Sequence, residues 1–146
     1  MRALILLLLV LFPGLVAACA HIDGERADAP EREPIPVPLV PFEERAGYGF
    51  AGPWGLRGML LPPEASGEPW RLSGRFQFDT AGYEVGAPVV SVQKRYPEAV
   101  TITLPVAEPP ADAMVAQVIT EIPFEKDIPV SSEAQFQIDI QPSSGG

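Results

Sequence analysis

The side chains best suited to covalent and acid–base chemistry are scarce in this sequence. Its 146 residues include one cysteine, Cys19, and one histidine, His21. Catalytic triads and cysteine–histidine pairs need a base that the fold holds beside a nucleophile, and zinc sites need several thiol or imidazole ligands. His21 lies in a charged segment that offers no such support. We therefore expect a protein that is not an enzyme and that has no metal site and no cofactor.

Carboxylates are the remaining candidates for chemistry. Two of them can hydrolyse a glycosidic bond, and several together can bind Ca²⁺. However, no pair stands out by its spacing, and no run of acids resembles a calcium-binding loop. We interpret the acids near expected loops and strand ends as solvated surface charge: Glu84, Glu98, Glu108, Asp112, Glu121, Glu125, Asp127, Glu133 and Asp139.

The charge balance argues against nucleic-acid binding. The chain has 10 Lys and Arg residues against 19 Asp and Glu residues, a formal net charge of −9. Nucleic-acid binding needs clustered basic residues that displace phosphate counterions, and the sequence has no basic stripe. We expect no nucleic-acid partner.

The first nineteen residues have the pattern of a secretory signal: a positive start, an apolar run over residues 3–12, and small residues before a cleavage point. Val16-Ala17-Ala18-Cys19 resembles the lipobox of bacterial lipoproteins. The resemblance implies that residues 1–18 are removed and that Cys19 carries the lipid. Two or more acyl chains hold a protein stably at a membrane, so the resemblance implies a membrane-anchored lipoprotein.

The residue after the cysteine bears on localisation. Ala20 stands where an Asp would retain such a lipoprotein at the inner membrane, so in a Gram-negative host the resemblance implies the periplasmic face of the outer membrane. Two alternatives remain. Ordinary cleavage before His21 would release a protein without cysteine. An uncleaved membrane helix would have to accommodate Pro13-Gly14 in a stretch of barely spanning length.

Residues 19–45 are expected to form a lipid-anchored tether. Their first half is rich in charge and favours disorder, whereas residues 35–41 alternate proline with aliphatic residues and favour polyproline II. We interpret the segment as a spacer that lifts a domain off the bilayer. A docking strip for a partner's aromatic groove and an extended edge strand on the domain are the alternatives.

Two segments further along show the period-2 alternation of half-buried strands. Residues 70–79 and 134–140 each place apolar and polar side chains on opposite sides. Residues 89–93 and 100–104 are β-branched and are expected to pair as a hairpin. Further strands are expected over 55–61 and 125–130, and residues 114–121 favour a strand over one short helix.

Short strands broken by 18 Pro and 13 Gly residues predict an all-β fold. We expect a small antiparallel β-sandwich, immunoglobulin-like or transthyretin-like, after an N-terminal signal helix and an extended Pro-rich tether; a small barrel is the alternative. The expected organisation is 1–18 signal peptide, 19–45 tether, 46–140 sandwich domain and 141–146 flexible tail.

Aromatic residues supply the candidate contact surface. Tyr48, Phe50 and Trp54 lie among four glycines, where large rings on a pliant backbone favour partner binding. The alternative is that this stretch packs into the core, as we expect for Trp70. We predict a non-enzymatic cell-envelope lipoprotein whose domain binds another envelope protein as an accessory or assembly subunit. A ligand-binding module for envelope glycan, lipid or Ca²⁺ is the alternative.

Overall fold

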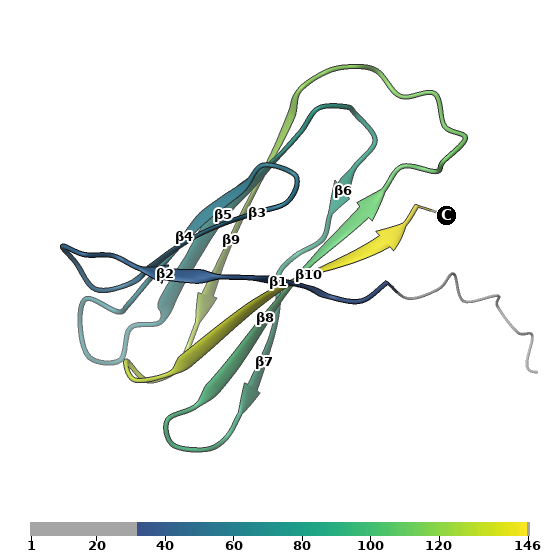
Figure 1. Ribbon diagram of the computed structural model, residues 1–146. Helices are drawn as coiled ribbons and strands as arrows, with labels where there is room; N and C mark the ends of the chain where they lie inside the picture. Colours follow the sequence, from purple (N-terminus) through teal and green to yellow (C-terminus); the bar gives the residue numbers. More distant parts are fainter. Residues whose placement is uncertain (1–31, 146) are drawn as a thin grey trace, which may run out of the picture.

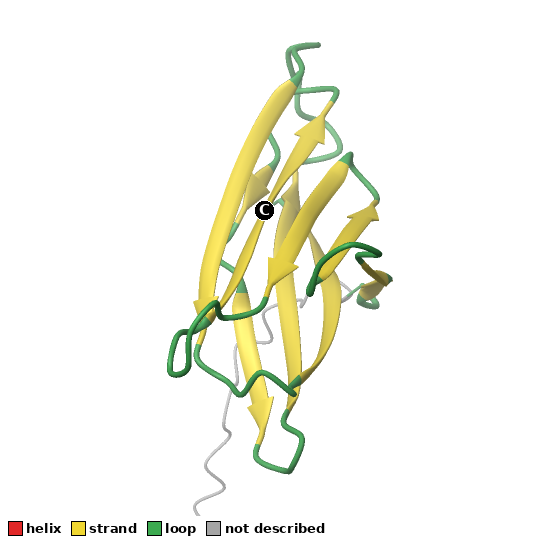
Figure 2. Ribbon diagram, turned by 90° about the vertical axis from the view of Figure 1, so that its left-hand side faces the viewer, coloured by secondary structure: helices red, strands yellow, loops and turns green. Residues whose placement is uncertain are grey.

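Residues 32–145, which the computed structural model describes, form two five-stranded sheets that pack face to face (Figures 1 and 2). The expected all-β sandwich is confirmed. The expected signal peptide, its helix and Cys19 lie outside the described residues. Within residues 32–145 no helix is long and apolar enough to cross a membrane.

One sheet, called sheet A, is built around a long central strand. Strand β8 pairs in parallel with β10 on one side, and on the other side it pairs antiparallel with β6 and β7. Strand β1 completes the sheet beyond β10. Sheet A is therefore mixed rather than purely antiparallel. Its strands are β1 (Ile35–Val37), β10 (Gln135–Ser144), β8 (Ala99–Glu108), β6 (Glu84–Val85) and β7 (Val89–Gln93).

The second sheet, sheet B, is antiparallel throughout and has the order β2-β3-β4-β5-β9. Its strands are β2 (Leu39–Pro41), β3 (Tyr48–Gly52), β4 (Leu56–Leu61), β5 (Trp70–Phe78) and β9 (Thr120–Ile128).

The core forms where the apolar sides of the two sheets meet. The alternation predicted for residues 70–79 is confirmed, because all four apolar side chains of β5 are buried while Arg71, Arg75 and Gln77 are exposed. In β10, Ile138 and Ile140 are buried and Gln135 and Gln137 are exposed as predicted, while Phe136 and Asp139 are half-buried. The core of the described residues contains no buried polar or charged side chain. The largest fully buried side chains are Phe76, Phe78, Leu56, Leu60, Leu72, Ile102, Leu104, Ile128, Ile138, Ile140, Val100 and Val106.

Two glycines at the centre of sheet B make room for two phenylalanine rings. Phe50, Gly58, Gly74 and Phe124 lie in one row across four neighbouring strands. A Cβ on Gly58 would lie 2.2 Å from Cζ of Phe50, and a Cβ on Gly74 would lie 2.6 Å from Cζ of Phe124. The rings therefore cover the glycines and replace the side chains that those positions lack.

Residues 35–41, the Pro-rich part of the segment 19–45 that we interpreted as a spacer, instead begin the sandwich. Residues 35–37 pair with β10 and residues 39–41 pair with β3, so the chain passes from sheet A to sheet B at Pro38. This is the edge-strand alternative. The segment forms edge strands because Ile35, Val37 and Leu39 contact the core. Its prolines cannot donate hydrogen bonds to a neighbouring strand, but they are tolerated on edge strands.

Two further boundaries differ from expectation. The segment 141–144, expected in a flexible tail, continues β10, and Pro142 is buried there. Residues 114–119, expected as a strand, belong to the loop 109–119 between β8 and β9. Their apolar side chains do not alternate, so no single face of a strand would bury them.

Candidate functional site

The loops of the sandwich gather at two opposite ends (Figure 1). The end where the described chain begins, at Arg32, is called the near end; it also holds the loops 53–55, 79–83 and 109–119 and Gly145, the last described residue. The far end holds the loops 42–47, 62–69, 94–98 and 129–134.

The three aromatic residues expected to form a contact surface do not lie together. Phe50 is buried in the core, where its ring covers Gly58. Tyr48 lies towards the far end, half-buried, with its ring centroid 6.4 Å from that of Trp70. Trp54 lies at the near end and packs against Tyr83. No partner can reach Phe50 without opening the core, and the side chains of Tyr48 and Trp54 are each half-buried.

The local backbone explains the position of Trp54. Trp54 and Gly55 both have positive φ, 54° and 61°, and Leu56 N donates to Pro53 O across the turn. Positive φ at both central residues of a hairpin turn is a conformation that favours glycine. A Cβ on Gly55 would lie 2.8 Å from Gln77 O, so glycine is required there. The glycines of this stretch therefore serve the β3–β4 turn and the packing of the sheet.

Trp70 is buried in the core, as expected, and connects β5 to the loops of the far end. Its indole Nε1 donates to Ser131 O at 2.9 Å, and its ring packs against Phe136 at 4.7 Å between centroids. The Ser131 hydroxyl donates to the Glu98 carboxylate. This hydrogen bond lowers the pKa of Glu98 below its usual value because it favours the ionised form.

Two carboxylates from different loops line one surface hollow at the far end. Glu68 and Glu98 border it together with residues of the loop 129–132. Each already has a donor from the chain, Ala65 N for Glu68 and the Ser131 hydroxyl for Glu98. Among residues 32–145, no group of three or more acidic, histidine or cysteine side chains is arranged to hold a metal ion.

The exposed face of sheet B carries charges that pair loosely. Arg71 lies 3.9 Å from Asp127, and Arg75 lies 3.8 Å from Glu121, with all four side chains at least half exposed. Exposed pairs of this kind contribute roughly 0–1 kcal/mol. These acids are solvated charges, as their sequence context indicates.

The edge strands of the sandwich differ in how they are protected against further strand pairing. Prolines, charges and short length are the usual protection. Strands β1 and β2 have three residues each and contain proline, β6 has two residues, and β9 contains Pro123 among four charged residues. Strand β7 has five residues, Val-Val-Ser-Val-Gln, with neither proline nor charge. Among the described edges, β7 alone lacks these protections.

The free edge of β7 also exposes apolar surface. The strand pairs only with β8 within residues 32–145, and Val89 and Val92 are exposed on it. The turn that follows carries two adjacent basic residues, Lys94 and Arg95, and the exposed ring of Tyr96. The outward-facing backbone N–H and C=O groups of β7 are thus available for hydrogen bonds to another strand, next to apolar and basic side chains.

Sequence reasoning identified the β7–β8 hairpin but not its free edge. The β-branched run 89–93 was a usable signal, but only the topology shows that no other described strand covers it. Comparisons with protein-family models, curated proteins and solved structures find no match for the chain.

Proposed function

We propose that this protein is a non-enzymatic cell-envelope lipoprotein, anchored through lipid on Cys19, whose sandwich domain binds an envelope protein as an accessory or assembly subunit. The partner adds an extended strand to the free edge of β7. The observation that carries this proposal is the missing protection of β7, compared with every other described edge.

Strand addition explains the composition of β7 physically. Main-chain hydrogen bonds to an open edge supply affinity, and side chains that alternate along the strand supply selectivity. A flat, uncharged edge promotes aggregation unless another strand covers it. A partner strand would cover Val89 and Val92, both of which are exposed in the isolated chain.

Charge further defines the partner's chemistry. Lys94 and Arg95 directly follow β7 in a chain of net charge −9. Opposite charges across an interface speed association and set the register of docking. The matching partner segment is therefore an apolar β-forming run that is flanked by carboxylates.

The experiment uses the tagged full-length chain, extracted from envelope membranes after mild crosslinking in cells. The test variant carries Val89→Lys and Val92→Lys, because lysine on an edge strand blocks further pairing. The matched control is Val40→Lys on β2, since Val40 and Val89 are 62% and 58% exposed. All three residues are exposed, so both variants are expected to melt within a few degrees of the wild type.

A stoichiometric envelope protein that copurifies with the wild type and the control, but not with the β7 variant, supports the proposal. Equal recovery with the β7 variant would place the contact elsewhere. If no protein copurifies with the wild type, the proposed role as an accessory or assembly subunit is refuted.

A ligand-binding module is the second candidate, and the hollow between Glu68 and Glu98 favours it. The two carboxylates reach that hollow from different loops, as a weak Ca²⁺ site would require. Calorimetric titration of the full-length protein with Ca²⁺ tests this function, with Glu68→Gln as the variant that should abolish any binding heat.

A further inference from the structure

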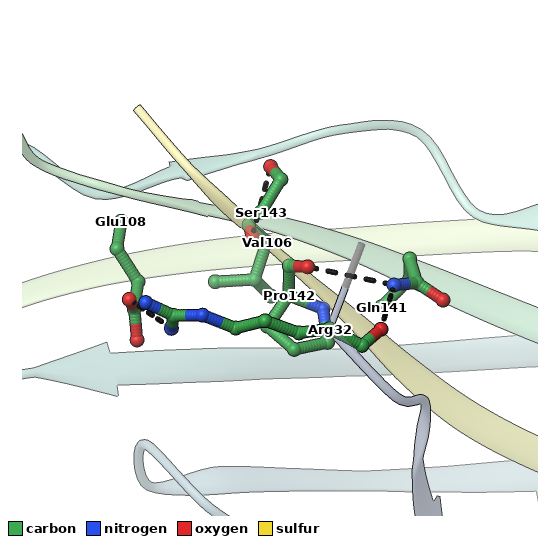
Figure 3. A network of polar contacts seen from close by, with 6 residues as sticks. All are labelled: Arg32, Val106, Glu108, Gln141, Pro142 and Ser143. Atoms are coloured by element: carbon green, nitrogen blue, oxygen red, sulfur yellow. Dashed lines mark hydrogen bonds and ion pairs between the residues drawn. The ribbon is translucent and has the colours of Figure 1, made fainter. Parts of the chain in front are cut away.

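The described chain begins at the near end of the sandwich, where Arg32 contacts two strands of sheet A. Arg32 forms an ion pair with Glu108 at the end of β8 (Figure 3). Gln141 Nε2 on β10 donates to Arg32 O at 2.7 Å. The position from which the chain leads back towards Cys19 is therefore fixed on the domain, beside the last residues of β8 and β10.

The distance to the proposed lipid anchor is limited by chain length. Thirteen residues lead from Cys19 to Arg32, and a fully extended chain of that length reaches about 45 Å. Because the segment that follows Cys19 enters the domain at the near end, a lipid anchor on Cys19 would hold this end closer to the bilayer than the far end.

The near end presents an apolar loop to solvent. Met114 is fully exposed, and Val118 and Ile119 are more than half exposed. Asp112 is the one charged residue in the loop 109–119. Single exposed apolar residues are common on protein surfaces, whereas contiguous exposed apolar patches mark sites of interaction with proteins or membranes.

The loop is held in place by contacts that leave these three side chains outside. Ala81 N donates to Ala116 O at 3.0 Å, and Ala113 N donates to Pro110 O at 2.9 Å. Val115, between them, turns inward to within 3.1 Å of the Cβ position on Gly82. Val115 is therefore half-buried, while Met114, Val118 and Ile119 on either side of it are exposed.

The loop and the attachment share one side of the molecule. Figure 1 shows the loop 109–119, the start of the described chain and its C-terminus together on the right, away from the β7–β8 turn at the bottom. The loop starts directly after Glu108, the residue that pairs with Arg32.

We propose that Met114, Val118 and Ile119 insert into the interfacial region of the bilayer that holds the lipid anchor. This inference rests on the anchor of the proposed function. The loop gives the domain a second point of contact with the membrane and so fixes its orientation. The near end faces the lipid, and the β7 edge and the Lys94-Arg95 turn extend away from it, where a partner can reach them.

The test places an environment-sensitive fluorophore at position 114 of the full-length, lipidated protein. Cys19 is the chain's only cysteine, and the proposed lipid blocks its thiol, so Met114→Cys supplies a single labelling site. The control is Tyr96→Cys in the far-end turn, where Tyr96 is 78% exposed. Both proteins are reconstituted into zwitterionic phosphatidylcholine vesicles that contain a doxyl-labelled phospholipid, and co-flotation with the vesicles is measured in parallel.

A blue-shifted emission that the doxyl lipid quenches at position 114, with no change at position 96, is the expected result. Adding Val118→Asp to the Met114→Cys protein should reverse that shift without reducing flotation. A labelled protein that floats with the vesicles but shows unquenched, water-like emission at position 114 would overturn the loop contact alone. Failure to float would refute the lipid anchor, and with it this inference.

Discussion

The ring of Phe50, which packs over Gly58, provides a stability test of the packing of sheet B. Replacing Gly58 with Ala would place a Cβ 2.2 Å from Phe50 Cζ and 2.6 Å from the backbone oxygen of Ser73. Carbon contacts are normally about 3.5–4.0 Å. The phenylalanine ring is buried and Ser73 belongs to the neighbouring strand β5, so neither can move freely.

The expected size follows from two opposing terms. Overpacking a filled core costs about 1–3 kcal/mol, while replacing glycine restricts the unfolded chain and returns about 0.4–1 kcal/mol. We therefore expect Gly58→Ala to lower the free energy of unfolding by roughly 1–2 kcal/mol, which corresponds to about 5–15 °C in melting temperature for a domain of this size.

Urea unfolding of the full-length protein, followed by tryptophan fluorescence, measures this change. Gly49→Ala on β3 is the control, because its Cβ would meet only the ring of Phe42, at 3.2 Å. Phe50→Leu should relieve part of the strain, so Gly58→Ala should cost less in that background than alone. An unchanged or higher midpoint for Gly58→Ala would refute the described packing of sheet B.

Four further predictions concern the far end, the core and the anchor. Trp70→Phe removes the hydrogen bond to Ser131 O and should cost about 1 kcal/mol in urea unfolding. The pKa of Glu98 is lower in the folded than in the unfolded protein, so the contribution of Glu98 to folding stability is complete above the unfolded pKa and is lost as the pH falls through the folded pKa. The difference in stability between the wild type and Ser131→Ala should therefore disappear on acidification. A difference that stays constant with pH would contradict the hydrogen bond between Ser131 and Glu98. Ile138→Asp buries an unpaired carboxylate and should cost more than about 4 kcal/mol, seen as loss of a cooperative circular-dichroism melt. Cys19→Ala should move the protein from the membrane to the soluble fraction or stall it uncleaved, and a processed variant that stays membrane-bound would refute the anchor.

The strand faces could be read from the sequence where one side of a strand is buried. A shift of one residue in β5 would bury Arg71 and Arg75 in place of Leu72 and Phe76, so the alternation specifies a single register. The hairpin of β7 and β8 was also predictable, because its β-branched strands are adjacent in the chain.

Tertiary contacts decided the elements that the sequence did not predict. Proline content favoured polyproline II for residues 35–41, but the packing of Ile35 and Val37 against the core outweighs that preference. The parallel pairing of β8 with β10 joins segments that are separated by all of β9, and no local pattern encodes it.

The loop 109–119 and the aromatic cluster show the same limit for the candidate sites. Residues 114–119 have strand-like composition, yet no neighbouring strand pairs with them. Phe50 was a candidate contact residue because rings near glycines resemble a binding surface, and only the register of β3 with β4 shows that its ring covers Gly58. In the loop 109–119 and at Phe50, the exposure of the side chains depends on the tertiary structure and cannot be predicted from the local sequence.

Photocrosslinking from the β7 edge in living cells tests the central claim most directly. A photoreactive amino acid at position 92 of the full-length chain, compared with the same amino acid at position 40 on β2, reports what lies against each edge. We expect one envelope protein, crosslinked from position 92 and not from position 40, with the crosslinked peptide mapping to an extended segment flanked by carboxylates. Equal labelling from both positions, or a partner captured only from position 40, would contradict it.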